Sequence, residues 1–364
     1  MRIHVILDPR LSPRRLAELG ALAESHGLEA VWTSSLVGAR DPFVAFVPLA
    51  QATRRLRLGP IAVNPFDIHP AKLAMSLLTL NELAGGRAQL VLGGGGEALE
   101  SLGLAPARRV LAVREAAALL REAASGRRFD FEGQLFRTRG FACDWVAAPP
   151  PMLWIGANGP QMLAMAATAA DGIMLSDLPP TLLAAAIADA RSHRAAAATA
   201  PKPAPATDAG APDTPVPASR GDALQAGLRA PLVFNNFVAW HVYDDATKAR
   251  AEARRWLAFR GLFRRWVCTT FISDAEYDAI EARQAAFYRW ATGGPPVEDL
   301  PESLLDRLVE HLTLTSTPDR LEPVLQHLEA MCAAGLTHVA LRLYQDIERS
   351  IELIGREVAP RLRD

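Results

Sequence analysis

Two glycine-rich segments, each directly after a short apolar run, contain the residue types best suited to bind a ligand and to transfer a proton. The first follows the apolar run 88–92 and reads Gly93-Gly-Gly-Gly-Glu97. Glycine lets the backbone approach a bound molecule closely, and a neighbouring carboxylate can serve as general acid or base. A tight structural turn followed by an exposed glutamate at a helix start would show the same residues, so both interpretations stay open.

The second segment, Gly156-Ala-Asn-Gly-Pro160, follows the apolar run 152–155 and precedes a helical pattern. Proline suits the first turn of a helix. The free amides and the positive dipole end of such a helix attract a phosphate or a carboxylate. An ordinary strand-to-helix turn has the same spacing, and this alternative also stays open.

These segments need a framework that brings several strand ends together. Apolar runs typical of buried strands alternate with helix-like segments along most of the chain. We expect strands at residues 3–7, 30–33, 58–63, 88–92, 152–155, 172–175, 231–243 and 337–343. We expect helices at residues 13–26, 42–52, 70–83, 108–124, 180–197 and 318–334. Further helices should begin near residue 160, lie within 244–290 and run from the last strand to residue 361.

This alternation predicts an α/β fold, a (β/α)8 TIM barrel that forms one domain over residues 1–364. Residues 129–141 have the pattern of a small inserted β-hairpin. Residues 198–221 are mostly Ala, Pro, Thr and Asp, which predicts a mobile, disordered surface loop. A doubly wound open sheet is the alternative fold, but the glycine segments lack its nucleotide-binding spacing. In a barrel the chemistry lies where the strands end, and both glycine segments fall there.

Composition excludes several classes of function. The 39 basic and 40 acidic residues nearly balance, which argues against binding to nucleic acid. No apolar run reaches the roughly 18 residues that a membrane span needs. The three cysteines lie far apart and the eight histidines lack metal-ligand spacing, so we predict neither a disulfide framework nor a metal site. A cytoplasmic protein that acts on a small molecule fits best.

Six motifs, in a fixed order along the chain, carry a resemblance to a known family. They are Asn64-Pro with His69-Pro, Thr79-Leu-x-Glu-Leu-x-Gly-Gly-Arg87, Gly93-Gly-Gly-Gly-Glu-Ala-Leu, Ile155-Gly-Ala-Asn-Gly-Pro, Ala170-Asp-Gly-Ile-Met-Leu and Ala359-Pro-Arg-Leu-Arg. Together they resemble the bacterial luciferase-like oxidoreductases, and above all the subgroup that uses the deazaflavin coenzyme F-420, such as methylene-tetrahydromethanopterin reductase. The resemblance covers nearly the whole chain except the Ala/Pro-rich loop and part of the arginine-rich region.

The resemblance implies where a cofactor would bind. In this family the end of the third strand has a non-prolyl cis peptide beneath the ring, which here would be the Ala62–Val63 bond. Asn64 would reach polar atoms of the ring, and Glu97 would be the catalytic residue for proton transfer. The implied cofactor-binding residues are Ala62, Val63, Asn64, Gly94, Gly95, Gly96, Gly156, Ala157, Asn158, Gly159 and Pro160, the last five holding the phosphate. The resemblance also implies a homodimer.

Two features depart from this pattern or add to it. Where dehydrogenases of this family place a histidine after the second strand, this chain has Trp32-Thr-Ser-Ser-Leu36. Ser34 and Ser35 would bond a cofactor or substrate, or act as local caps. A group of arginines predicts a solvated helical face or, alternatively, an anchor for the cofactor's glutamyl tail or for an anionic substrate. These are Arg254, Arg255, Arg260, Arg264 and Arg265.

The function we expect is hydride transfer between coenzyme F-420 and an organic substrate. The first alternative is an FMN-dependent two-component monooxygenase that receives reduced FMN from a flavin reductase. The second is a barrel that binds a flavin-like ligand without turnover, and the missing histidine motivates it.

Overall fold

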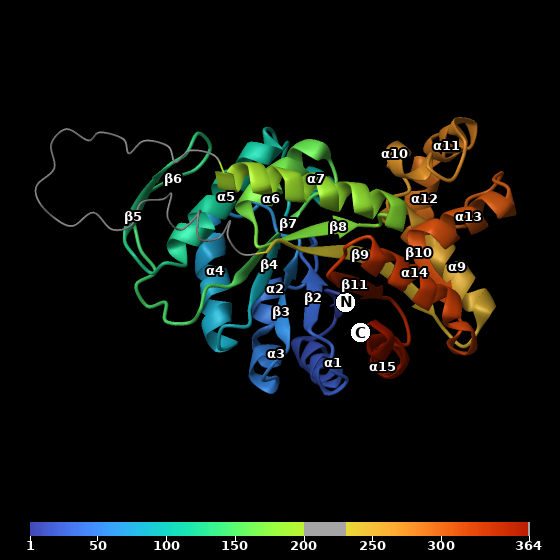
Figure 1. The fold of residues 1–364 in the computed structure, drawn as a ribbon, viewed down its shortest axis with the longest axis horizontal. Coiled ribbons are helices and arrows are strands. Elements are labelled where there is room, and N and C mark those ends of the chain that lie inside the picture. The colour runs from blue at the N-terminus through green and yellow to red at the C-terminus, as the bar shows by residue number, and fades with distance from the viewer. Residues whose placement is uncertain (200–230, 363–364) are drawn as a thin grey trace, which may run out of the picture.

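Eight parallel strands form the centre of the molecule and close into a barrel (Figure 1). The computed structural model describes residues 1–199 and 231–362, so the predicted loop over 198–221 lies almost entirely outside the described residues. The barrel strands are β1 (Arg2–Leu7), β2 (Ala30–Ser34), β3 (Arg57–Ile61), β4 (Gln89–Leu92), β7 (Met152–Gly156), β8 (Gly172–Ser176), β9 (Val233–Val242) and β11 (His338–Leu343). Their order is β3-β2-β1-β11-β9-β8-β7-β4, and bridges from Leu58 to Ala88 and from Val63 to Leu92 join β4 to β3. The predicted (β/α)8 barrel is confirmed.

Helices cover the outside of this barrel, and several begin at capping residues. α1 (Pro13–Ser25) begins after Ser12, whose hydroxyl accepts a backbone N–H of the first turn. α4 (Pro70–Leu83) begins after His69, whose Nδ1 accepts the N–H of Ala71. The other outer helices are α2 (Pro42–Ala45), α3 (Val47–Ala52), α5 (Arg109–Ala123), α6 (Pro160–Ala169), α7 (Pro180–Thr199), α14 (Glu322–Ala333), α15 (Ile347–Leu353) and α16 (Ala359–Leu362). None of the helices in the described ranges is long and apolar enough to cross a membrane.

Two elements differ from the sequence prediction. The single helix expected over residues 42–52 is divided into α2 and α3, which meet at Phe46. Pro48 lies in the first turn of α3 and has no N–H to continue the hydrogen bonds of α2. A strand that was not predicted, β10 (Thr313–Ser316), pairs in parallel with the C-terminal part of β9, with Thr313 opposite Ala239.

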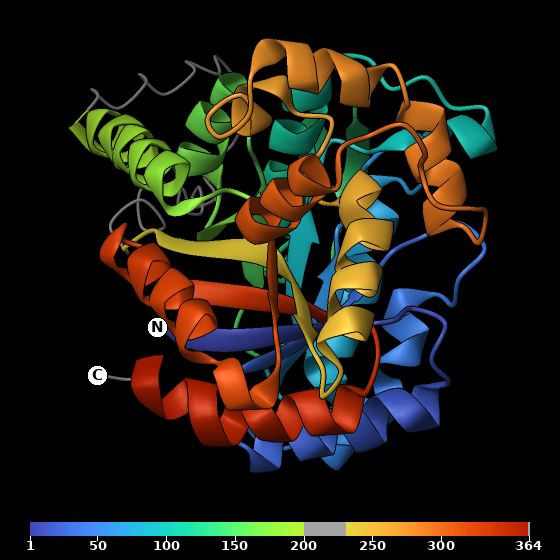
Figure 2. The ribbon, with the colours of Figure 1, turned by 90° about the vertical axis from the view of Figure 1, so that its right-hand side faces the viewer.

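Two insertions extend from the barrel on different sides (Figure 1). The predicted hairpin is confirmed as β5 (Phe129–Glu132) and β6 (Arg137–Phe141), which pair antiparallel. The larger insertion lies between β9 and β11, and its yellow to orange helices face the viewer in Figure 2. It contains α9 (Ala246–Trp256), the 3-10 turn η2 (Leu257–Phe259), α10 (Arg265–Cys268), α11 (Asp274–Glu281), α12 (Gln284–Ala291) and α13 (Glu302–Leu312).

Large side chains fill the inside of the barrel. The members of this inner cluster are Ile6, Trp32, Ile61, Val91, Trp154, Met174 and Ala340, with Phe237 packed against them. The two tryptophans are fully buried, and their rings meet edge to face at 6.3 Å. The barrel is therefore a packed core without a channel, and polar side chains that point inward lie at its two ends.

Arg87 holds the connection between α3 and β3. Its guanidinium donates to the backbone oxygens of Ala50 (2.7 Å), Thr53 (3.0 Å) and Leu56 (2.6 Å), and to the hydroxyl of Thr53 (3.0 Å). These oxygens lie at the end of α3 and just after it, where helical carbonyls lack partners in the helix. One side chain thus satisfies the carbonyls that lead into β3, the strand whose end carries Ala62.

Candidate functional site

The carboxyl ends of the eight strands lie at one rim of the barrel, and the predicted site begins at the end of β3. A non-prolyl cis peptide is present there, but it joins Ile61 to Ala62. The prediction of a cis Ala62–Val63 bond was therefore wrong by one position. Val63 is tied to β4 by both of its backbone groups: its N–H donates to Val91 (3.0 Å) and its carbonyl accepts the N–H of Gly93 (2.8 Å). The irregular linkage thus falls before Ala62, which is exposed at the rim.

Three of the four glycines after β4 have close neighbours or a backbone conformation that favours glycine. A Cβ on Gly93 would lie 3.2 Å from the Cβ of Ala62, and one on Gly94 would lie 3.3 Å from the methyl carbon of Met162 in α6. Gly95 has φ +74°, a conformation that favours glycine. Gly96 is exposed, and a Cβ there would meet nothing within 4 Å. The backbone of this segment therefore lies directly against the end of β3 and the start of α6.

Glu97, the predicted catalytic residue, begins the 3-10 helix η1 (Glu97–Leu102) immediately after these glycines. Its side chain lies outside the described part of the structure. Its backbone follows Gly96, so the residue lies on the same part of the rim as Ala62 and Gly94. A carboxylate at this position suits proton transfer to a molecule bound at the rim.

The segment after β7 lies on the neighbouring part of the rim, because β7 pairs with β4. Gly159 precedes α6 with no side-chain cap, and both Gly159 and Pro160 are exposed, so the helix start is accessible to an anion. Gly156 and the buried Ala157 continue the strand, with the N–H of Ala157 donating to Met174 (3.0 Å). The predicted segments at the ends of β3, β4 and β7 thus form one continuous arc, called here the glycine arc.

The two asparagines of the glycine arc are engaged in local hydrogen bonds. Asn64 accepts the N–H groups of Phe66 (2.9 Å) and Asp67 (3.3 Å) and donates to the Asp67 carboxylate (2.9 Å). Asn158 accepts the N–H of Ser176 (3.0 Å) and donates to its hydroxyl (3.2 Å). These amides shape the turns, so the backbone of the arc offers more free polar groups to a ligand than its side chains do.

Across the barrel, at the ends of β9 and β11, the structure places polar residues that the sequence prediction missed. His241 on β9 and Arg342 on β11 are polar residues that follow the apolar segments Phe237–Trp240 and Val339–Leu341, and this break in the apolar pattern was the signal that could have revealed them. Tyr344 follows β11, and its ring stacks on His241 at 4.8 Å. Together with Arg260, which follows η2, these residues are called here the basic arc.

The histidine of the basic arc is held in its neutral form. Burial, together with the positive charge of Arg260, lowers the pKa of His241 from 6.5 to about 3. The hydroxyl of Tyr243 lies 3.4 Å from its Nδ1. Asp177 at the end of β8 is also buried, and burial raises the pKa of its carboxyl, an effect that Arg260 and Arg264 partly offset.

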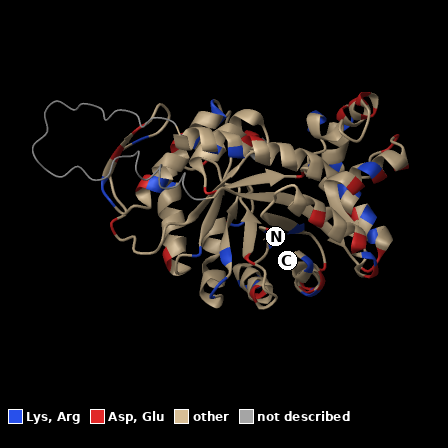
Figure 3. Ribbon diagram, in the orientation of Figure 1, with Lys and Arg blue, Asp and Glu red and all other residues tan. Residues whose placement is uncertain are grey.

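The arginine group of the insertion is divided between two environments. Arg254, Arg255 and Arg265 pair with carboxylates outside the barrel, and Figure 3 shows acidic and basic segments interspersed on these helices. Arg260 and Arg264 instead point to the barrel rim, so the interpretation as a solvated face is wrong for these two. Arg264 donates to the carbonyl and the hydroxyl oxygens of Ser176 (2.6 and 2.8 Å).

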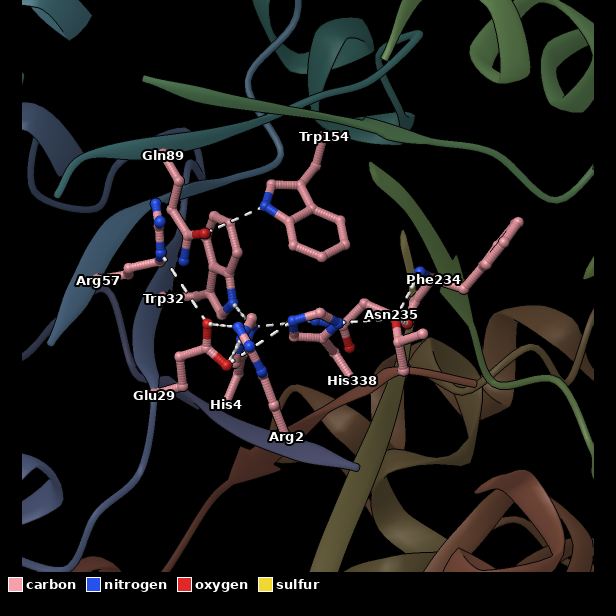
Figure 4. A network of polar contacts seen from close by, with 11 residues as sticks. Arg2, His4, Glu29, Trp32, Arg57, Gln89, Trp154, Phe234, Asn235 and His338 are labelled. Atoms are coloured by element: carbon pink, nitrogen blue, oxygen red, sulfur yellow. Dashed lines mark hydrogen bonds and ion pairs between the residues drawn. The ribbon is translucent and has the colours of Figure 1, made fainter. Parts of the chain in front are cut away.

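At the opposite, amino end of the barrel, three possible metal ligands lie together (Figure 4). Ligand atoms of His4, Glu29 and His338 lie within 4.8 Å of one another, a grouping that sequence spacing did not reveal. However, Nδ1 of His4 accepts the indole N–H of Trp32 (3.0 Å). Because indole nitrogen only donates, Nδ1 carries no proton and Nε2 carries it, which leaves Nε2 no lone pair for a metal. The geometry favours a cluster of hydrogen-bonded side chains at this end of the barrel. The absence of a metal stays a prediction.

Comparison with known proteins identifies the family. Residues 1–338 match the family model described as luciferase-like monooxygenase. The chain belongs to this family. Like other luciferase-like proteins it is an oxidoreductase, built on the barrel described above.

Two luciferase-like relatives match over nearly the full length of the chain. A 5,10-methylenetetrahydromethanopterin reductase of Archaeoglobus fulgidus is 28% identical over 369 residues, covering 100% of both chains. An F-420-dependent glucose-6-phosphate dehydrogenase of Rhodococcus erythropolis is 27% identical over 374 residues, covering 97% of this chain and 95% of the relative.

Solved structures share the fold. The coenzyme F-420-dependent tetrahydromethanopterin reductase from Methanopyrus kandleri aligns with a TM-score of 0.73 at 21% identity, covering 99% of this chain and 98% of that one. A type II Baeyer-Villiger monooxygenase from Pseudomonas putida, in complex with FMN, aligns with a TM-score of 0.60 at 17% identity, over 99% of both chains.

Proposed function

We propose that the chain is an F-420-dependent oxidoreductase that transfers a hydride between this cofactor and an organic substrate. The observation that carries the proposal is the end-to-end similarity to F-420-dependent relatives, and the glycine arc supports it with backbone that carries no side chains at the rim. Gly94 and Gly95 are half-buried, Gly96 is exposed, and Ala62 is exposed beside them. This bare surface fits a planar ring, and the start of α6 fits a phosphate.

Each residue of the glycine arc has a role in this proposal. Bound F-420 supplies the hydride chemistry, because its deazaflavin ring accepts or donates a hydride. Ala62, Val63 and Asn64 would support one face of the ring, and Gly94 to Gly96 would pass beside it. Residues 156–160 would bind the phosphate through the free amides at the start of α6. Glu97 would exchange a proton with the substrate through its carboxylate.

Cofactor titration tests the first half of the proposal. Purified protein is titrated with F-420 and, separately, with FMN, and binding is followed by fluorescence quenching. We expect saturable binding of F-420. Tight binding of FMN alone would overturn the deazaflavin assignment in favour of a two-component monooxygenase. The fold neighbour in complex with FMN and the description of the family model support this alternative.

Turnover by a Glu97→Gln variant tests the second half. F-420-dependent turnover is measured on a panel of alcohols, aldehydes and enones. Loss of the proton-transfer group should lower kcat about 100-fold or more, while F-420 binding is unchanged. Glu100→Gln, on the same 3-10 helix and exposed, is the matched control and should keep full activity. No turnover by the parent protein with either cofactor would support a binding barrel without catalysis, an alternative motivated by the missing histidine after β2.

A further inference from the structure

The basic arc contains two buried guanidinium groups whose hydrogen bonds are incomplete. The side chains of Arg260 and Arg342 are 8% and 12% exposed. Among the residues that the structure describes, neither Arg260 Nε nor Arg342 Nη1 has an acceptor. Buried polar groups in native proteins are almost always paired, and an exception calls for an explanation. Two exceptions of the same charge at one end of the barrel indicate a shared function.

The neighbouring carboxylates do not fully neutralise these two cations. Asp177 lies 3.5 Å from Arg260, and Asp8 lies 3.8 Å from Arg342. Strong pairs of this kind have distances of about 2.7–2.9 Å. Asp8 is also engaged elsewhere, because it accepts the backbone N–H of Arg10 (2.8 Å). The basic arc therefore keeps a positive charge inside the rim, which an anion would stabilise.

The two guanidinium groups are positioned by aromatic rings. Arg260 lies 4.4 Å above the ring of Phe237, which packs on the inner cluster, and so lies over the middle of the barrel end. Arg342 lies 5.1 Å from the ring of Tyr344. Burial lowers the pKa of Arg342, and the neighbouring charge of Arg260 lowers it further. The planar faces are held by the rings, which leaves the N–H edges for a planar or tetrahedral anion.

His241 adds a third polar group at the same place. Its ring stacks on Tyr344, and Arg260 is near enough to influence its titration. Within the described residues its Nε2 has no hydrogen-bond partner. A neutral imidazole beside two guanidinium groups supplies a hydrogen bond without a further charge.

The place of the basic arc in the strand order indicates which molecule carries the anion. The glycine arc uses β3, β4 and β7, which are consecutive in the closed order of strands. His241 and Arg342 of the basic arc lie on β9 and β11, which β8 separates from β7 on one side and β1 and β2 separate from β3 on the other. Arg260 comes from the insertion and pairs with Asp177 just after β8. A cofactor held at the glycine arc would thus face the basic arc across the rim, and the substrate would lie between them.

We propose that Arg260 and Arg342, assisted by His241, bind an anionic group of the substrate, a carboxylate or a phosphate. The assignment of the anion to a substrate rests on the proposed function. Anion binding itself is testable without any cofactor. It makes the substrate class an organic acid or a phosphate ester that also carries the carbon to which the hydride moves.

Calorimetric titration of the cofactor-free protein with malonate and with inorganic phosphate, at low ionic strength, tests the inference. We expect one bound anion per chain. Arg260→Met and Arg342→Met should each weaken binding about tenfold or more, because each removes a charged hydrogen bond. Arg265→Met is the matched control, since this arginine of the same insertion pairs with Asp274 at 2.9 Å outside the barrel. No binding by the parent protein, or equal weakening in the control, would overturn the inference.

Folding of each variant is checked by circular dichroism. If a methionine variant does not fold, Arg260→Lys and Arg342→Lys keep the charge and lose only the forked donor, and malonate affinity should still fall several-fold. Unchanged malonate affinity in both lysine variants would refute the site.

A second arm separates the substrate from the cofactor as the source of the anion. F-420 and its deazaflavin chromophore without phosphate and glutamyl tail are titrated into Arg260→Met and Arg342→Met. We expect both ligands to keep their affinity. A loss confined to the full cofactor would assign the anion to its tail and overturn the assignment to substrate. Anion binding lost in both arginine variants, in a protein that binds neither F-420 nor FMN, would instead reject the proposed function and leave the anion site standing.

Discussion

Two imidazoles inside the amino end of the barrel, His4 and His338, make its stability depend on pH. Burial, together with the neighbouring His4, lowers the pKa of His338 from 6.5 to about 3, and burial also lowers the pKa of His4. An unfolded histidine titrates near pH 6.5, so between about pH 6.5 and 3 the unfolded chain binds a proton at residue 338 that the folded chain does not. The free energy of unfolding should therefore fall with falling pH, by about 1.4 kcal/mol per pH unit for His338, and His4 acts in the same direction.

Urea unfolding at a series of pH values between 7.5 and 5 measures this dependence. His338→Gln removes one titrating group, so its stability should decline less steeply toward acid pH than that of the parent. His193→Gln, an exposed residue on α7, is the control and should keep the parent's slope. A parent protein that becomes more stable as the pH falls through this range would contradict the burial of neutral imidazoles.

Single residues were predicted from sequence only where backbone chemistry decides their role. The glycines after β4 are required by close contacts such as Gly93 with Ala62, and a glycine run predicts such contacts. Asn64 and Asn158 illustrate the limit, because an asparagine near a turn fits a ligand contact and a local hydrogen bond equally well. Arg260 was named within the arginine group, with an anion anchor as one interpretation, but His241 and Arg342 were missed. The insertion that carries Arg260 reaches the barrel end through packing that local patterns do not describe.

Among the elements, the α3–β3 connection depends on one side chain from another part of the chain. Arg87→Met would remove the hydrogen bonds to Ala50, Thr53 and Leu56 and leave buried carbonyls unpaired. We expect the free energy of unfolding to fall by about 3 kcal/mol, measured by urea unfolding. Arg54→Met, at an exposed position in the same connection, should change stability by no more than about 0.5 kcal/mol. Equal stability of the two variants would show that these hydrogen bonds contribute nothing net.

The barrel strands were predictable because each is a buried apolar run between turn residues. The strand β10 was not, since Thr-Leu-Thr-Ser is short and polar, and it exists only because β9 extends beyond its other neighbours. The break between α2 and α3 did have a signal in the sequence, namely Pro48, whose missing N–H interrupts the helix. Local chemistry thus predicted the elements, whereas pairing partners from distant segments decided where several of them end.

For the whole molecule, closure of the barrel places two chemically different arcs face to face. The glycine arc offers bare backbone and a helix start, and the basic arc offers guanidinium groups and a neutral imidazole. Alternation of strands and helices along the sequence predicts the barrel and, through it, the common rim. The alternation does not predict which strand ends carry charged side chains, because that depends on a few inward-facing residues near those ends.

The outer surface suggests how two copies would associate. Val44 on α2 is 67% exposed, and Met75 and Leu83 on the adjoining α4 are 40% and 43% exposed. Exposed apolar side chains on neighbouring helices favour burial against a second copy, in line with the homodimer that the family resemblance implies. Light scattering should then give twice 39.3 kDa, and Val44→Glu or Met75→Glu should shift the protein to monomer, whereas Leu135→Glu on the hairpin side should not. A single species of 39.3 kDa for the parent protein would rule the dimer out.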